Sequence, residues 1–248
     1  MPHFFINSKD VNNDKIVISD KDNYQHIAKS LRIKKGENLL LIDENQIQYE
    51  TVVVEVTSKE VTVHIENSYK SNRNLNFGLY LAQSPLRSDA QSIVIEKATE
   101  LGTKGVYPII TDNCAINKII VEKKIPKWQK IMYEASKQCE RAAVPTCFEM
   151  SSLKDLCSSN KFDKIIAFCE RRTDLTLKQF VAYNPIMPDE NILIIIGPEG
   201  GFSDDEFKLF EDNEIPMLTL GNLILKAETA VIVALGNIIY EFNNYRKN

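Results

Sequence analysis

The chain is 248 residues long and carries a net charge of −4, with 44% hydrophobic and 26% charged residues. This length provides one large domain or two small ones with a substantial core, and the ordinary composition excludes a disordered, collagen-like or disulfide-rich protein. No apolar run approaches the ~18 residues of a membrane-spanning helix, and the N-terminus lacks the basic flank and long apolar run of a secretory signal. We expect a cytoplasmic protein without a membrane partner, and the acidic charge weakly disfavours a nucleic-acid partner.

Cysteines and histidines do not form a metal-binding or disulfide pattern. The five cysteines are odd in number and include no Cys-x-x-Cys pair, and the three histidines have no second ligand at metal spacing. We therefore expect no metal centre. Glycine is scarce, with nine residues in the chain, yet Gly197, Gly200 and Gly201 lie close together. This cluster is the first candidate for a functional loop.

The first seventy residues have the pattern of a small β-barrel domain, which we place at residues 1–70. One helix is predicted from Asp22 to Ile33, closed by Gly36. The polar, unpatterned segment Asn67–Asn74 is the predicted linker. Apolar runs and alternating segments predict five strands, at Phe4–Ile6, Lys15–Ser19, Asn38–Asp43, Gln46–Val56 and Val61–Ile65.

Strands and helices alternate after this linker, which predicts an α/β domain with a mostly parallel sheet over residues 75–248. The predicted strands are Leu75–Ala82, Val106–Ile110, Lys164–Cys169, Ile192–Ile196 and Met217–Leu220. The predicted helices are Ser88–Leu101 with a Ser88/Gln91 capping box, Lys127–Arg141, Leu175–Val181, Asp204–Glu211 and a long helix from Ala227. Because ligands bind at the carboxyl ends of parallel strands, the loops after Cys169, Ile196 and Leu220 form the candidate site.

The glycine loop follows a strongly apolar strand and leads into a helix through a second capping box, Ser203 with Glu206. Its glycines allow the backbone to approach a ligand closely. The carboxylates of Glu199, Asp204, Asp205 and Glu206 argue against a phosphate, and no Lys-Ser/Thr follows as in a P-loop. A neutral or cationic ligand held by the backbone, such as S-adenosylmethionine (SAM), fits this loop better. A plain tight turn is the alternative.

A second informative segment runs from Leu220 to Ala230. It contains a strand end, a glycine turn, an irregular apolar stretch over Leu223–Leu225, and a polar Lys-Ala-Glu-Thr that opens the last helix. The loop backbone could read the edge of an adenine while the leucines pack on its faces. The alternative is that Leu223–Leu225 belong to the core.

Together the two segments resemble the RsmE family of the SPOUT methyltransferases, whose members methylate N3 of a uridine in 16S ribosomal RNA. Three further motifs carry the resemblance through most of the chain, namely Gln25–Arg32, Ile95–Gly102 and Gln138–Pro145. The resemblance implies an N-terminal PUA-like barrel, a C-terminal SPOUT domain with a deep trefoil knot that binds SAM, and a homodimer whose subunits share each active site. The partner it implies is 16S rRNA or the 30S subunit.

The resemblance also implies site residues. The cofactor set is Cys169, Glu170, Ile196, Gly197, Glu199, Gly200, Gly201, Leu220, Gly221, Leu223, Ile224, Leu225 and Thr229. The family commonly has arginine where this chain has His3, Leu223 and Lys226, which affects RNA contacts more than the cofactor pocket.

Methylation at N3 requires removal of the uracil N3 proton and stabilisation of the developing negative charge on the carbonyl oxygens. We assign Arg141 to those oxygens and Glu199 or Glu228 to the proton. For Glu228, a favourable charge at a helix N-terminus is an equal alternative.

RNA phosphates are bound by cationic side chains, so a chain with a net negative charge must have its basic residues clustered on one part of its surface. The candidates are Lys29, Arg32, Lys34, Lys35 and Arg87, with the stretch Lys118–Lys130 as a second track. Either cluster could instead be an ordinary solvated face. Two alternative functions remain, a SPOUT enzyme for tRNA or another RNA site, and a catalytically weak ribosome-assembly factor.

Overall fold

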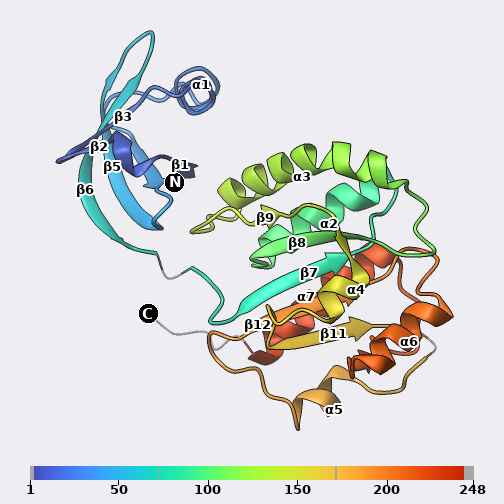
Figure 1. The fold of residues 1–248 in the computed structure, drawn as a ribbon. Helices are drawn as coiled ribbons and strands as arrows, with labels where there is room; N and C mark the ends of the chain where they lie inside the picture. Colours follow the sequence, from blue (N-terminus) through green and yellow to red (C-terminus); the bar gives the residue numbers. More distant parts are fainter. Residues whose placement is uncertain (1–2, 72, 171, 243–248) are drawn as a thin grey trace. The chain divides into compact units, whose positions relative to one another are not determined.

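The computed structural model describes residues 3–71, 73–170 and 172–242 (Figure 1). The chain divides into two compact units. One unit extends to Asn74 and also includes Ser136–Ala143, and the other contains Leu75–Ala135 and the chain from Val144 onward. Among the described residues, no helix is long and apolar enough to cross a membrane.

The first unit is built on a six-stranded sheet with the order β1-β4-β5-β6-β3-β2. All neighbouring strands in it are antiparallel except β1 and β4. Its strands are β1 (His3–Phe5), β2 (Val11–Asn12), β3 (Lys15–Ile18), β4 (Asn38–Ile42), β5 (Ile47–Val56) and β6 (Val61–Lys70). Alternate strand residues, including Ile16, Leu39 and Val63, form its apolar core. A short 3-10 turn, η1 (Ser8–Asp10), precedes β2.

The helical segment of this unit is shorter than predicted. It begins as α1 (Lys21–Tyr24), where the Asp20 side chain accepts a hydrogen bond from the Asn23 N–H at 2.9 Å, and continues as the π-helical η2 (Gln25–Ser30). The predicted continuation to Ile33 is wrong, because Arg32 takes a positive φ of 53° that ends the helix.

The predicted linker is wrong at its N-terminal end, because β6 extends to Lys70. Ser68 and Tyr69 pair with Tyr49 and Gln48 of β5. The Tyr69 hydroxyl also accepts a hydrogen bond from the Gln48 amide at 2.5 Å. Cross-strand hydrogen bonds of this kind stabilise the pairing of polar strand residues. Such residues do not alternate with apolar ones, so the sequence pattern did not indicate a strand here.

The second unit contains a parallel sheet with the order β10-β8-β7-β12-β11-β13, to which β9 adds by pairing with β8. Every pairing in it among the described residues is parallel, as the alternation predicts. The strands are β7 (Gly78–Gln83), β8 (Gly105–Ile110), β9 (Thr146–Cys147), β10 (Ser151–Ser152), β11 (Lys164–Phe168), β12 (Asn191–Ile196) and β13 (Met217–Leu218).

Helices cover both faces of this sheet (Figure 1). One core contains residues of α2 (Ser88–Glu100), α3 (Lys118–Gln138), α5 (Leu177–Val181) and α7 (Ala227–Phe242). The core on the other face contains residues of α4 (Leu153–Cys157) and α6 (Asp204–Asp212). Successive residues of the central strand β12 alternate between the two cores, which fixes the strand in the middle of the layered structure.

Helix α2 begins at Ser88, as predicted, and its N-cap is Arg87. The Gln91 side chain accepts a hydrogen bond from the Leu86 N–H at 2.8 Å, and the Ser88 side chain, on which the predicted capping box depends, lies outside the described part of the structure. Helix α3 begins at Lys118 rather than Lys127 and contains Pro126. It ends at Gln138 rather than at Arg141, and Glu140 beyond it has a positive φ of 56°.

Candidate functional site

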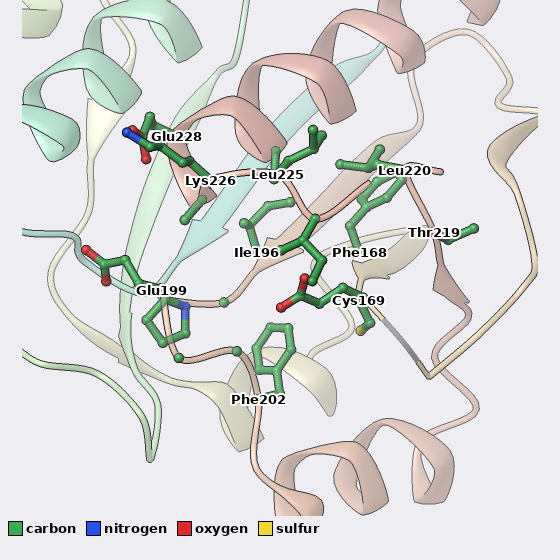
Figure 2. Close-up of a pocket in the computed structure, with 18 of the residues that line it drawn as sticks. Phe168, Cys169, Ile196, Glu199, Phe202, Thr219, Leu220, Leu225, Lys226 and Glu228 are labelled. Atoms are coloured by element: carbon green, nitrogen blue, oxygen red, sulfur yellow. The ribbon is translucent and has the colours of Figure 1, made fainter. Parts of the chain in front are cut away.

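A pocket of about 710 Å³ lies where β11, β12 and β13 end (Figure 2). The last residue of β11, Phe168, pairs with Ile196 on one side and Leu218 on the other, so three strand ends meet at one edge. The loops that leave these strands form most of the pocket wall, and α2, α6 and the start of α7 complete it. This is the edge that the parallel sheet predicts for a ligand site.

The glycine loop forms one wall. The Gly201 N–H donates to the Pro198 carbonyl at 2.9 Å, and Gly201 has a φ of 67°, which closes a tight turn. A side chain at Gly197 would lie 3.2 Å from the ring of Phe202. The predicted capping box is confirmed, since Ser203 and Glu206 exchange side-chain and backbone hydrogen bonds at the start of α6.

The loop between β13 and α7 forms the opposite wall. Gly221 has a φ of 119°, and its N–H donates to the Thr219 hydroxyl at 3.1 Å. Leu223 is 81% exposed and Ile224 55% exposed, and both line the pocket. The alternative that these two residues belong to the core is therefore wrong. They are available to pack on a flat ligand.

The interior of the pocket is apolar and aromatic. Phe202 packs edge-on against Phe210 with ring centroids 5.0 Å apart. Arg172, which follows β11, stacks over the ring of Phe207 at 4.6 Å and forms an ion pair with Asp204. Cys169 is buried, and burial raises the pKa of its thiol to about 12, so the thiol stays protonated. It contributes packing rather than reactivity.

Charged side chains line part of the pocket. Glu199 comes from the glycine loop, Lys226 from the residue before α7, Glu228 from the first turn of α7, and Arg87 from the residue before α2. In Figure 2, Glu199 and Glu228 lie on one side of the pocket, away from Leu220 and Thr219. The site therefore combines an apolar region with an end that carries both charge signs.

The structure brings together all of the predicted cofactor residues except Thr229, which is exposed on α7 and does not line the pocket. Glu199 and Glu228 line it, and so does Arg87, which we assigned to RNA. Further lining residues lie outside the predicted cofactor loops, namely Ala90, Phe168, Arg172, Phe202, Phe207, Thr219, Lys226, Ala227 and Ala230. Most of these lie beside the predicted loops, whereas Ala90 and Phe207 come from α2 and α6.

Arg141 belongs to the segment Ser136–Ala143 of the first unit, whereas the residues that line the pocket belong to the second. It is only 9% exposed. Burial lowers the pKa of its guanidinium to about 10. The predicted barrel residues Lys29, Arg32, Lys34 and Lys35 are all exposed, and the Lys29 ammonium lies 5.7 Å from the centre of the Tyr24 ring.

Comparison with known proteins identifies the family. An RNA methyltransferase domain matches residues 73–239, and an RNA methyltransferase PUA domain matches residues 13–66. The chain belongs to the RNA methyltransferase family. Its predicted resemblance to the RsmE family is confirmed by relatives named ribosomal RNA small subunit methyltransferase E.

Family members resemble this chain over nearly its whole length. The relative from Mesomycoplasma hyopneumoniae is 30% identical over 243 residues, which is 96% of this chain and 99% of that protein. The relative from Bacillus subtilis is 27% identical over 87% of this chain and 86% of its own. A putative methyltransferase from Legionella pneumophila, solved in complex with SAM, is 27% identical with a TM-score of 0.85 and 98% of both chains covered.

Proposed function

We propose that this protein transfers a methyl group from SAM to N3 of a uridine in 16S ribosomal RNA of the small subunit. The observation that carries the proposal is the pocket at the ends of β11, β12 and β13, which collects the loops expected to hold SAM. A SAM complex of a 27% identical protein with the same fold supports it. The RsmE resemblance supplies the uracil N3 position, and a ribosomal substrate agrees with the names of the relatives.

The residues present fit SAM. The pocket volume lies within the ~300–1,000 Å³ of ordinary small-molecule sites. Glycine backbone at Gly197, Gly200 and Gly221 provides polar groups, and exposed leucine and isoleucine side chains provide flat apolar surfaces. The carboxylates of Glu170 and Glu199 suit a cationic sulfonium. When bound, SAM supplies an activated methyl group.

The charged end of the pocket suits the acceptor base. Glu199 and Glu228 are the candidate acceptors of the N3 proton, and both line the pocket. Arg87 lines the same pocket with an exposed side chain. We therefore assign to Arg87 the stabilisation of negative charge that develops on the uracil oxygens. The role that we predicted for Arg141 stays a prediction.

RNA binding by the first unit completes the proposal. Its exposed Lys29, Arg32, Lys34 and Lys35 offer cations to phosphates around the target, and the target base must leave its stack to enter the pocket. The homodimer, the trefoil knot and the cytoplasmic location stay predictions.

A methyl-transfer assay tests the proposal. Purified protein is titrated with SAM by calorimetry and then incubated with labelled SAM and either 30S subunits or naked 16S rRNA from a deletion strain. We expect saturable SAM binding and label in 3-methyluridine with at least one of the two substrates. SAM binding without transfer would favour the assembly-factor alternative, and label in a nucleoside other than 3-methyluridine would favour another RNA site.

A further inference from the structure

The loop that follows β8 lies against the glycine loop, although the two are almost ninety residues apart in the sequence. The side-chain amide of Asn113 donates to the Gly200 carbonyl at 3.1 Å and to the Gly201 carbonyl at 3.2 Å. Because both partners are acceptors, the NH₂ group rather than the oxygen of this amide must face them. One side chain therefore holds two successive carbonyls of the glycine loop.

Close contact with Asn113 explains the glycine at position 200. A Cβ atom there would lie 2.9 Å from the Asn113 Cβ, closer than real side chains approach. At Gly201 the reason differs, since a Cβ would meet open space but the backbone has a φ of 67°. The glycine at position 200 is therefore required by Asn113, a residue that does not line the pocket.

A second set of bonds fixes the same two loops further along. The Ser203 hydroxyl donates to the Asp112 carboxylate at 2.5 Å, and the Asp112 N–H donates to the Glu206 carboxylate at 3.0 Å. Glu206 is buried, and burial raises the pKa of its carboxyl. The loop after β8 is itself anchored, because the Thr111 and Ser84 hydroxyls are hydrogen-bonded at 2.8 Å in the interior.

These contacts set the direction of the peptide groups in the pocket wall. In one peptide plane the carbonyl and the following N–H point in opposite directions. Holding the Gly201 carbonyl therefore also orients the Phe202 N–H, and holding the Gly200 carbonyl supports the bond from the Gly201 N–H to the Pro198 carbonyl. Gly201 and Phe202 both line the pocket. A loop that is already ordered loses less entropy when a ligand binds.

We propose that Asn113 is a positioning residue for the methyl donor, which holds the Gly200–Gly201 backbone in the conformation that SAM binds. This inference rests on the proposed function, because it takes SAM as the ligand of the pocket. It adds Asn113, which is outside the predicted cofactor set, and assigns to the loop after β8 the positioning of the glycine loop for SAM binding.

The test uses two variants and a matched control in the full-length protein. Asn113→Ala removes the amide, and Asn113→Asp places a carboxylate against two carbonyl oxygens at nearly unchanged volume. Asn184 provides the control, since its amide also donates to a backbone carbonyl, that of Phe180, at 3.0 Å, on an exposed residue away from the pocket lining. The control variants are Asn184→Ala and Asn184→Asp.

We expect SAM to bind about five- to tenfold more weakly to Asn113→Ala and more weakly still to Asn113→Asp, as loss of two hydrogen bonds implies. The affinity of Asn113→Asp should recover in part near pH 5, where the new carboxyl becomes protonated. The KM for SAM should rise while kcat at saturating SAM stays near that of the wild type. Amide hydrogen exchange in residues 198–203 should become faster, and the Asn184 variants should behave like the wild type.

The possible failures are distinguishable. A wild-type protein that does not bind SAM would overturn the proposed function. A wild-type protein that binds SAM, with unchanged affinity in both Asn113 variants, would overturn the positioning role alone. Unchanged hydrogen exchange in residues 198–203 of the Asn113 variants would also overturn it.

Discussion

Three neighbouring glycines in the pocket wall are glycine for three different physical reasons. Gly197 lies against an aromatic ring, Gly200 against Asn113, and Gly201 has a positive φ. The cluster could be recognised from the sequence as part of a ligand site because a run of glycines is a local signal. Asn113 could not, since no local pattern marks a residue whose partners lie 87 and 88 positions later.

Arg87 is the arginine that we assign to catalysis. It lines the pocket with an exposed side chain, whereas Arg141 belongs to the first unit and is buried. We expect Arg87→Ala to lower the single-turnover rate of methyl transfer about 100-fold, as for loss of one stabilising donor, with SAM affinity nearly unchanged. Arg141→Ala is the comparison. A full rate in Arg87→Ala together with a large loss in Arg141→Ala would reverse our assignment.

His3 makes the stability of the first unit depend on pH. Burial lowers the pKa of His3 to about 4, and neither ring nitrogen has a hydrogen-bond partner among the described residues. Between that value and the ordinary ~6.5 the unfolded chain binds the proton and the folded protein does not, so stability falls as the pH decreases through this range.

We expect this effect to reach about 3 kcal/mol at pH 4 and His3→Phe to remove most of it. Urea unfolding at pH 7, 5.5 and 4 measures the difference. His64→Phe, at a half-buried site beside Asp14, is the control. If the wild type and His3→Phe lost stability in parallel, the burial of a neutral His3 would be contradicted.

At the scale of elements, the long strands and helices of the second unit follow from hydrophobic periodicity. Strand β12 and helices α6 and α7 begin within one residue of their predicted positions. The elements β9, β10 and α4 were missed because two-residue strands and a single helical turn carry no periodicity. The early start of α3 was missed because Pro126 is typical of a helix boundary, although this helix continues through it.

Helix α6 connects folding stability to the pocket through its N-cap. Ser203 caps α6 and also donates to Asp112. We expect Ser203→Ala to lower the free energy of unfolding by about 1 kcal/mol and to weaken SAM binding as well. Ser152→Ala removes the N-cap of α4, away from the pocket lining, and should cost similar stability without changing SAM affinity. If Ser203→Ala and Ser152→Ala bound SAM with equal affinity, the connection between the N-cap of α6 and the pocket would be contradicted.

At the scale of the whole molecule, an acidic protein binds RNA only through a local basic surface. The net charge is −4, but Lys29, Arg32, Lys34 and Lys35 are exposed together on and after the helical segment of the first unit. The net charge alone is therefore a poor guide to the partner. Family matches over both units, rather than composition, identify the chain as an RNA methyltransferase.

Charge reversal tests this basic surface. The double variant Arg32→Glu, Lys35→Glu should bind RNA more weakly. The slope of log affinity against log salt concentration should decrease in magnitude by about 0.7–0.9 for each phosphate that the protein no longer neutralises. SAM affinity should not change. Lys59→Glu, exposed between β5 and β6 of the same unit, is the control. Unchanged RNA affinity in the double variant would exclude these residues from the RNA-binding surface.

Nucleoside mass mapping of 16S rRNA tests the central claim most directly. Ribosomal RNA from a strain that lacks the gene is compared with RNA from the parent and from the deletion strain treated with purified protein and SAM. We predict that 3-methyluridine disappears from 16S rRNA on deletion and returns at one position after treatment. Retention of 3-methyluridine in the 16S rRNA of the deletion strain would contradict the proposed function.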